Sequence, residues 1–221
     1  NDYLPSCRGD IIVFTDANAM LNRHAIRKLA GHFSDERVGC VVGHLKYVDT
    51  LTPAAKGEGV YFRYEAMIKS LESAHGTLAA ATGSLYAVRR ELCLPLDLDI
   101  ANDLMHPIHA VSQGYKVVFE PEAVATEKAT SSSSEEFRRR ARIVTRGLTA
   151  FFRHCLRRRL LMGMWGFCFI SHKLLRWFVP LYLIALFALT LLLASESSTF
   201  RLILYMQLAF YALAAATILR N

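Results

Sequence analysis

The sequence predicts a layered α/β domain that continues into membrane-associated helices. Strand-like and helix-like patterns alternate from residue 10 to residue 121. A basic segment follows, with nine arginines and no acidic residue between residues 137 and 159. Two runs of 18 uncharged residues then occupy positions 177–194 and 202–219. A chain of 221 residues is long enough for one α/β domain of ordinary size together with these additional segments.

The alternating half of the chain contains four strand patterns and three helix patterns. Strands are predicted over residues 10–15, 38–48, 83–90 and 115–121, and helices over residues 22–33, 59–76 and 101–114. The first strand is short, apolar and bounded by Gly9 and Asp16, so we expect it to be fully buried. Because strands and helices alternate, we expect a mostly parallel sheet between layers of helices.

The basic segment is predicted to be a helix that starts near residue 135 and lies at a membrane surface. Apolar residues such as Ile143, Leu148 and Phe152 interleave with the arginines, as an interfacial amphipathic helix requires. This pattern argues for anionic lipid and against nucleic acid as the partner of the arginines. Residues 160–170 are too short to span a bilayer, so a second interfacial helix is expected there.

The two uncharged runs are near the lower length limit for a bilayer span, and the short link between them predicts a transmembrane helical hairpin. Both outer ends of a hairpin face the same side of the membrane. The arginines, together with His172, Lys173 and Arg176, place that side in the cytoplasm. We therefore expect a multi-pass protein of the inner or plasma membrane, with its α/β domain in the cytoplasm.

The spacing of the cysteines and the two ends of the chain give two further indications. The five cysteines are scattered and form no CxxC pair, which argues against a zinc site or a disulfide framework. The chain begins at Asn1 without a methionine and ends at Asn221 beside an apolar run, so we interpret it as a fragment cut at both ends.

The stretch TDANA at residues 15–19 places a carboxylate directly after the first strand. Ligands of open α/β sheets bind outside the carboxyl ends of strands, where Asp16 and Asn18 could hold a divalent cation. Such an ion can neutralise a diphosphate leaving group. The alternative is that Asp16 caps the following turn, which is a common role of aspartate at this position.

Four motifs in order, followed by apolar helices, make the chain resemble the family 2 glycosyltransferases, which include cellulose, chitin and hyaluronan synthases. The motifs are TDANA (15–19), ATGSLYAVRRE (81–91), ANDLMHPI (101–108) and RRARI (139–143). The resemblance covers nearly the whole chain and implies a partial GT-A domain of Rossmann-like α/β type, without the half that binds the nucleotide. It also implies that this fragment alone does not transfer sugar.

The resemblance also implies roles for individual residues. Asp16, with Asn18 in place of the second acid, would bind Mg²⁺ or Mn²⁺ on the nucleotide diphosphate. Asp103 would be the general base, and Asn102 stands where the family usually has glutamate. The other reading of Asp103 is an acid that stabilises a helix N-terminus.

The glycine-containing motif would line the acceptor side of the site through Gly83 and Ser84, and Asn102 is grouped with them as a candidate contact of the acceptor. Arg142 matches the arginine of the family's QxxRW motif and would hold the departing diphosphate, because a guanidinium binds phosphate oxygens in a forked geometry. Arg139 and Ile143 replace the glutamine and the tryptophan of that motif. We group Arg139 with Arg142 as a candidate contact of the nucleotide.

The predicted organisation has three parts: residues 1–133 form the C-terminal part of a GT-A catalytic domain, residues 134–176 form basic interfacial helices, and residues 177–221 form two transmembrane helices. The resemblance implies an inverting glycosyltransferase of hexosyltransferase type. Its donor would be a nucleotide sugar, with a uridine diphosphate sugar expected, and its acceptor a polysaccharide or a lipid-linked glycan. The alternative function is a non-catalytic membrane-anchored protein that binds a sugar or a partner.

Overall fold

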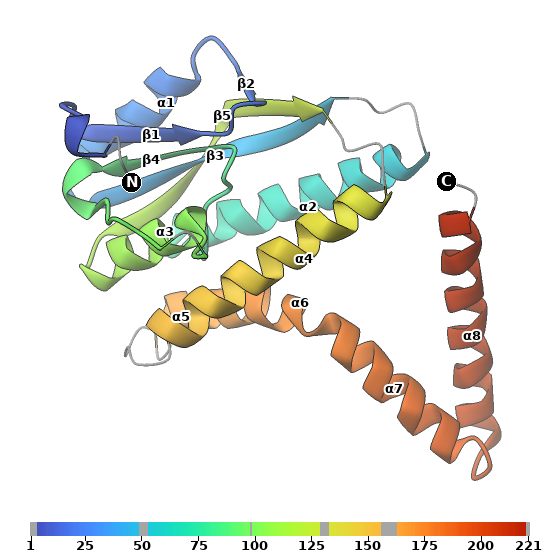
Figure 1. Cartoon of the computed structure of the whole chain (residues 1–221). Helices are drawn as coiled ribbons and strands as arrows, with labels where there is room; N and C mark the ends of the chain where they lie inside the picture. The colour runs from blue at the N-terminus through green and yellow to red at the C-terminus, as the bar shows by residue number, and fades with distance from the viewer. Residues whose placement is uncertain (1–3, 49–52, 98, 129–132, 156–162, 220–221) are drawn as a thin grey trace.

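The computed structural model describes residues 4–48, 53–97, 99–128, 133–155 and 163–219. Figure 1 shows a sheet with helix α1 (Ala25–Gly31) on one face and helices α2 (Pro53–Ala74) and α3 (Asn102–Ser112) on the other. The segment that includes α4 (Ser133–Ala150) lies beyond α2 and α3. Three short 3₁₀ turns complete the α/β part, at Leu4–Ser6, His32–Ser34 and Arg90–Leu92.

The sheet has five strands in the order β1-β4-β3-β5-β2. Their bounds are Ile11–Thr15 for β1, Met20–Leu21 for β2, Val38–Val48 for β3, Leu85–Arg89 for β4 and Lys116–Lys128 for β5. Only the β3–β5 pair is parallel among the described strands, and the other three pairs are antiparallel. The expectation of a mostly parallel sheet was therefore wrong, because periodicity locates strands and cannot show which distant strand lies beside each one.

Strand β1 also differs from the prediction of a fully buried strand. It lies at the edge of the described sheet and pairs with β4 alone. Its side chains from Ile11 to Phe14 are only partly buried. The apolar run in the sequence correctly indicated a strand, but burial depends on how many neighbours the strand has, which the run itself cannot specify.

Alternating side chains give the sheet two apolar faces. Val41, Leu85 and Ala87 pack with Leu29 of α1 on one face. Cys40, Val42, Tyr86 and Val88 pack with Ala110 of α3 on the other. Gly43 lies where the register between β3 and β5 shifts, and a β-carbon at this position would be 2.8 Å from the carbonyl oxygen of Ala123. The chain is therefore bent at a point where a side chain does not fit.

A further layer packs on the outer side of α3. It comprises α4, the π-helical segments η4 (Phe151–Cys155) and η6 (Ile170–Leu174), and helices α5 (Met164–Phe169) and α6 (Leu175–Trp177). Phe151, Trp165 and Phe169 pack against Leu104 and Ile108 of α3. Within segment 160–170, for which an interfacial helix is predicted, Trp165 and Phe169 are buried in protein, and Met164 and Phe167 are exposed. Residues 160–162 and the arginines at positions 157–159 lie outside the described residues.

Helices α7 (Val179–Leu193) and α8 (Ser198–Leu219) extend away from this body (Figure 1). Over the described residues, one helix, Ser198–Ala216, is long and apolar enough to cross a membrane. A second candidate is a bent pair, Met164–Trp177 with Val179–Leu193, whose parts meet at 61°. Because of this bend, α7 begins at Val179 and is shorter than the transmembrane helix predicted from residue 177. Pro180 explains the bend, because proline cannot donate the helical hydrogen bond to residue 176.

Candidate active site

Two loops bring the predicted metal ligand and the predicted base to the same edge of the sheet. Asp16 follows the last residue of β1, where the amide of Ala19 donates to the Asp16 carbonyl over 3.1 Å and closes a turn. The hydroxyl of Thr15 donates to the carbonyl of Ser84 over 3.0 Å. This bond ties the end of β1 to the segment before β4. Asn18 is exposed within the turn.

Asp103 lies in the first turn of α3, where its backbone is bound on two sides. The amide of Asp103 donates to the side-chain oxygen of Asn102 over 3.0 Å. The carbonyl of Asp103 accepts from the amide of Ala81 over 2.9 Å. The segment around Gly83 is thus anchored both to β1 and to the start of α3.

Gly83 is the point at which the two carboxylates meet. A β-carbon built on Gly83 would lie 3.5 Å from Oδ2 of Asp103 and 3.6 Å from Oδ2 of Asp16. Both carboxylates therefore border the same small space, and the absence of a side chain at Gly83 leaves that space open. Asp16, Gly83, Ser84, Asn102 and Asp103, which the sequence analysis selected separately, lie together in the fold.

The carboxylates influence each other electrostatically. Burial of the Asp103 carboxyl group raises its pKa, the positive charge of Lys173 opposes this change, and the negative charge of Asp16 reinforces it. Hydrogen bonds from backbone amides, including that of Gly83, also oppose the rise. The net result is a raised pKa, which makes the ionised carboxylate a stronger proton acceptor.

An aromatic group packs beside the two acids. Phe14 stacks on Tyr86 with ring centroids 4.8 Å apart, and the hydroxyl of Tyr86 is 3.1 Å from Nδ1 of His106. Burial, with the charges of Asp103 and Asp16 among the further causes, raises the pKa of Tyr86. Burial lowers the pKa of His106 to about 4. His106 is therefore a neutral, buried ring that links α3 to β4.

The candidate arginines on α4 have different surroundings. The guanidinium of Arg139 donates to the hydroxyl of Tyr47 over 2.6 Å and lies 5.6 Å from the centre of the Tyr47 ring. Its Nε is also 3.6 Å from a carboxylate oxygen of Glu136. Arg139 thus contacts protein groups of β3 and of its own helix. Arg142 is exposed on the following turn of α4.

Sequence reasoning missed a buried group of charged residues close to this site. Glu65, Lys69 and Glu72 on α2 face His172, Lys173 and Arg176 on the segment that joins α5 to α7, and we call these six residues the α2–η6 ion cluster. In the sequence, the last three residues count only towards the cytoplasmic side of the membrane, and the fold adds that they face carboxylates. The spacing i, i+4, i+7 of the charges on α2 was the available signal, because it places them on one face.

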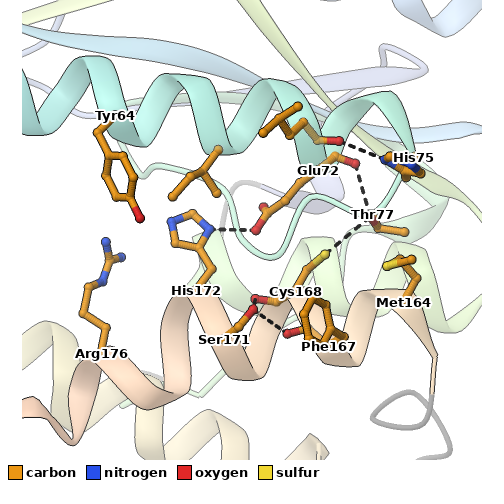
Figure 2. A pocket seen from close by; sticks show the side chains of 12 residues that line it. Tyr64, Glu72, His75, Thr77, Met164, Phe167, Cys168, Ser171, His172 and Arg176 are labelled. Carbon is orange, nitrogen blue, oxygen red and sulfur yellow. Dashed lines mark hydrogen bonds and ion pairs between the residues drawn. The ribbon is translucent and has the colours of Figure 1, made fainter.

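A groove of about 460 Å³ runs along this cluster between α2 and α5. Figure 2 shows Tyr64, Glu72 and His75 on one side and Phe167, His172 and Arg176 on the other. Its lining includes neither Asp16 nor Asp103, so the groove is separate from the space beside Gly83.

The available ligands fit a divalent cation that is shared with a substrate. The described residues contain no group of three or more histidine, cysteine, aspartate or glutamate side chains placed to hold a metal ion. Asp16 and Asn18 nevertheless offer hard oxygen donors at an open strand end, and Mg²⁺ or Mn²⁺ commonly takes only one or two carboxylates plus phosphate oxygens and water.

The α/β part has a GT-A-like fold. The chain is similar to a solved mannosyltransferase from Pyrobaculum calidifontis, in complex with GDP-Man and Mn²⁺. The match covers 99% of this chain and 65% of the mannosyltransferase chain, with 22% sequence identity and a TM-score of 0.61. This chain therefore spans about two thirds of that enzyme's length, and at this identity the likeness shows the fold alone. A second similar structure is glucosyl-3-phosphoglycerate synthase from Mycobacterium tuberculosis, in complex with Mn²⁺ and UDP-glucose. This match covers 64% of the present chain and 49% of the synthase chain, with 17% sequence identity and a TM-score of 0.42.

The family follows from the sequence comparison. The family model described as "Glycosyltransferase like family 2" matches residues 1–145, which is more than half of the chain. The chain belongs to this family. No curated protein matches it.

Proposed function

We propose that this chain is the acceptor-side part of a membrane-bound inverting glycosyltransferase that uses a nucleotide diphosphate sugar. The observation that supports this proposal most is the meeting of Asp16 and Asp103 beside Gly83. An inverting transfer needs one carboxylate as base and positive charge near the diphosphate, and this edge of the sheet offers a place for each.

In the proposed reaction, Asp103 accepts the proton of an acceptor hydroxyl while that oxygen attacks the anomeric carbon. The bond from this carbon to the diphosphate oxygen breaks, and its electron pair leaves with the nucleoside diphosphate on the opposite face of the sugar. The raised pKa of Asp103 favours proton transfer. The open space at Gly83 lets the acceptor approach the backbone.

Asp16 and Asn18 would hold Mg²⁺ or Mn²⁺. When bound, the ion would supply the charge that neutralises the departing diphosphate. Arg142, exposed on α4, is the proposed further cation for phosphate oxygens, whereas the contacts of Arg139 with Tyr47 favour a structural role for that residue. The GDP-Man and Mn²⁺ of the mannosyltransferase structure support a nucleotide-sugar donor and such an ion.

We also propose that α7 and α8 cross the membrane as a hairpin. Their exposed surfaces are almost wholly apolar. The hydroxyl of Thr190 on α7 donates to the side-chain oxygen of Gln207 on α8 over 2.7 Å, which links two polar groups between otherwise apolar helices. The basic helix α4 would then face anionic lipid on the cytoplasmic side, with a polysaccharide or a lipid-linked glycan as acceptor.

The proposal is tested by Asp103→Asn in the full-length protein that carries this sequence. Membranes are assayed with a panel of radiolabelled uridine and guanosine diphosphate sugars, with and without a chelator followed by Mn²⁺. We expect transfer to fall by roughly 10²- to 10⁴-fold while nucleotide binding is kept, because the variant loses the proton acceptor. Asp97→Asn, at an exposed acid nearby, is the matched control. Unchanged transfer in Asp103→Asn would show that Asp103 is not the base, whereas no transfer by wild type with any donor of the panel would support the non-catalytic alternative.

A further inference from the structure

The α2–η6 ion cluster is buried and closely paired. Glu65, Lys69 and Glu72 are each only 7% exposed. Nδ1 of His172 lies 2.8 Å from Glu72, and Nε2 of the same ring lies 3.1 Å from Glu65 (Figure 2 shows the His172–Glu72 pair). Lys173 and Arg176 approach Glu65 at 3.5 Å and 2.8 Å. The segment that leads into α7 is therefore attached to α2 by charged groups that, apart from the half-buried Arg176, are largely shielded from water.

Lys69 links this cluster to the active site. Its ammonium donates to the hydroxyl of Thr82 over 2.7 Å and lies 5.8 Å from the centre of the Phe119 ring. Thr82 is the residue before Gly83, and its carbonyl accepts from the amide of Leu85 over 3.2 Å. The segment from Ala81 to Ser84 is thus attached to β1 through Ser84, to α3 through Ala81 and to α2 through Thr82.

We propose that Lys69 is a positioning residue of the active site, which holds the Thr82–Gly83 backbone between Asp16 and Asp103. Gly83 has no side chain, so its position depends on the attachments of its neighbours. The Lys69 bond comes from a third direction and involves a charged donor, which makes it stronger than a bond between neutral groups. This inference rests on the proposed function, because it assigns Lys69 to the same reaction.

The ion cluster in turn supports Lys69. A buried ammonium group needs nearby carboxylates, and Glu65 and Glu72 lie one turn before Lys69 and one turn after it. The pKa of Lys69 is lowered to about 8, mainly by burial; the charges of Lys173 and Arg176 contribute to the decrease, and the two glutamates oppose it. Docking of the segment Ile170–Trp177 against α2 therefore affects the Lys69 ammonium, which holds the loop from Ala81 to Ser84. Turnover should depend on this docked segment as well as on the loop.

The test compares Lys69→Met, Thr82→Val, Thr82→Ser and the double variant Lys69→Met/Thr82→Val in the full-length protein. We expect both Lys69→Met and Thr82→Val to lower kcat by roughly 10- to 100-fold with the KM for the donor within about twofold, because the reacting groups are misplaced while the donor site is kept. Thr82→Ser keeps the hydroxyl and should restore most of the rate. The double variant should be no slower than the slower single variant, because both changes remove one interaction.

Hydrogen exchange gives a readout that does not depend on transfer. The amides of Ala81 and Leu85 report on this loop, since they donate to Asp103 and Thr82. We expect exchange in the peptide spanning residues 81–85 to be about tenfold faster in Lys69→Met. Arg63→Met, at an exposed cation on the same helix, should leave it unchanged.

Three results would overturn the inference: kcat within twofold of wild type in Lys69→Met, losses that multiply in the double variant, or unchanged exchange at residues 81–85. If wild type and Asp103→Asn alike transfer no sugar, the proposed function fails, and the exchange result alone decides the role of Lys69. Accelerated exchange at residues 81–85 with normal exchange in Arg63→Met would then still support it.

Discussion

His172→Gln removes the residue that joins both carboxylates of the α2–η6 ion cluster. In the structure, both ring nitrogens of His172 face carboxylate oxygens, at 2.8 Å from Glu72 and 3.1 Å from Glu65. An ionised carboxylate only accepts hydrogen bonds, so both nitrogens must donate and the ring must carry a positive charge. Burial opposes this charge, but hydrogen bonds to the two glutamates outweigh it and raise the pKa of His172 above its ordinary value.

The size of the effect follows from the partners that remain. Removing one member of a buried ion pair costs about 3–5 kcal/mol. Glu65 keeps Lys173 and Arg176, Glu72 keeps the amide of Ala79 at 3.1 Å, and a glutamine amide can still reach one carboxylate. These contacts offset roughly 1 kcal/mol or more of the cost. We therefore expect a loss of about 2–3 kcal/mol in the free energy of unfolding, or roughly 5–10 °C in Tm.

The pH dependence gives the stricter test. A group whose pKa is raised by folding stabilises the fold fully below its unfolded pKa, about 6.5 for histidine. This contribution is lost as the pH rises through the folded pKa. The difference in stability between wild type and His172→Gln should therefore be largest near pH 6 and should shrink as the pH rises through the raised folded pKa of His172.

The assay is thermal unfolding of the purified chain in detergent across this pH range. His75→Gln is the control, because His75 is exposed at the end of the same groove and should change stability by less than about 0.5 kcal/mol at every pH. Equal stability of wild type and His172→Gln at pH 6, or a difference that does not change with pH, would show that the charged ring does not hold the cluster.

Two further substitutions test the packing around the site. In the full-length protein, Gly83→Ala should leave Tm within about 2 °C, because its methyl group makes ordinary contacts of 3.5 and 3.6 Å. It should nevertheless lower kcat/KM at least tenfold by filling the space between Asp16 and Asp103, and normal kinetics of the variant would place the reaction elsewhere. Gly147→Ala places a β-carbon 2.5 Å from the Trp177 ring and should destabilise the chain by about 1 kcal/mol in thermal unfolding, despite the better helix propensity of alanine. Gly31→Ala is the control for this variant, since a β-carbon there meets nothing within 4 Å and should stabilise the chain. If Gly147→Ala also stabilised the chain, α4 would not pack against Trp177 of α6.

Most elements could be predicted from the sequence because their signals are local. The apolar run before Asp16, the strand-like pattern in residues 38–48 and the helical spacing before Gly114 were all confirmed as β1, β3 and α3. Candidate site residues could also be selected locally, since acids and glycines at the ends of strands and at the starts of helices are visible in the chain. The lengths of β5 and α2 were underestimated, because both continue through residues that lack a clear pattern.

The sequence by itself determined where β1, β3, β4 and β5 begin, which helices are apolar on all sides, and which acids are available for chemistry, because each of these properties depends on neighbours within a few positions; the two-residue strand β2 was missed. The tertiary structure decided that β4 lies between β1 and β3, that Asp16 and Asp103 meet at Gly83, and that His172 bonds to carboxylates about a hundred residues away in sequence. These are contacts between distant segments. They depend on how whole layers pack, and no short stretch of sequence records that information.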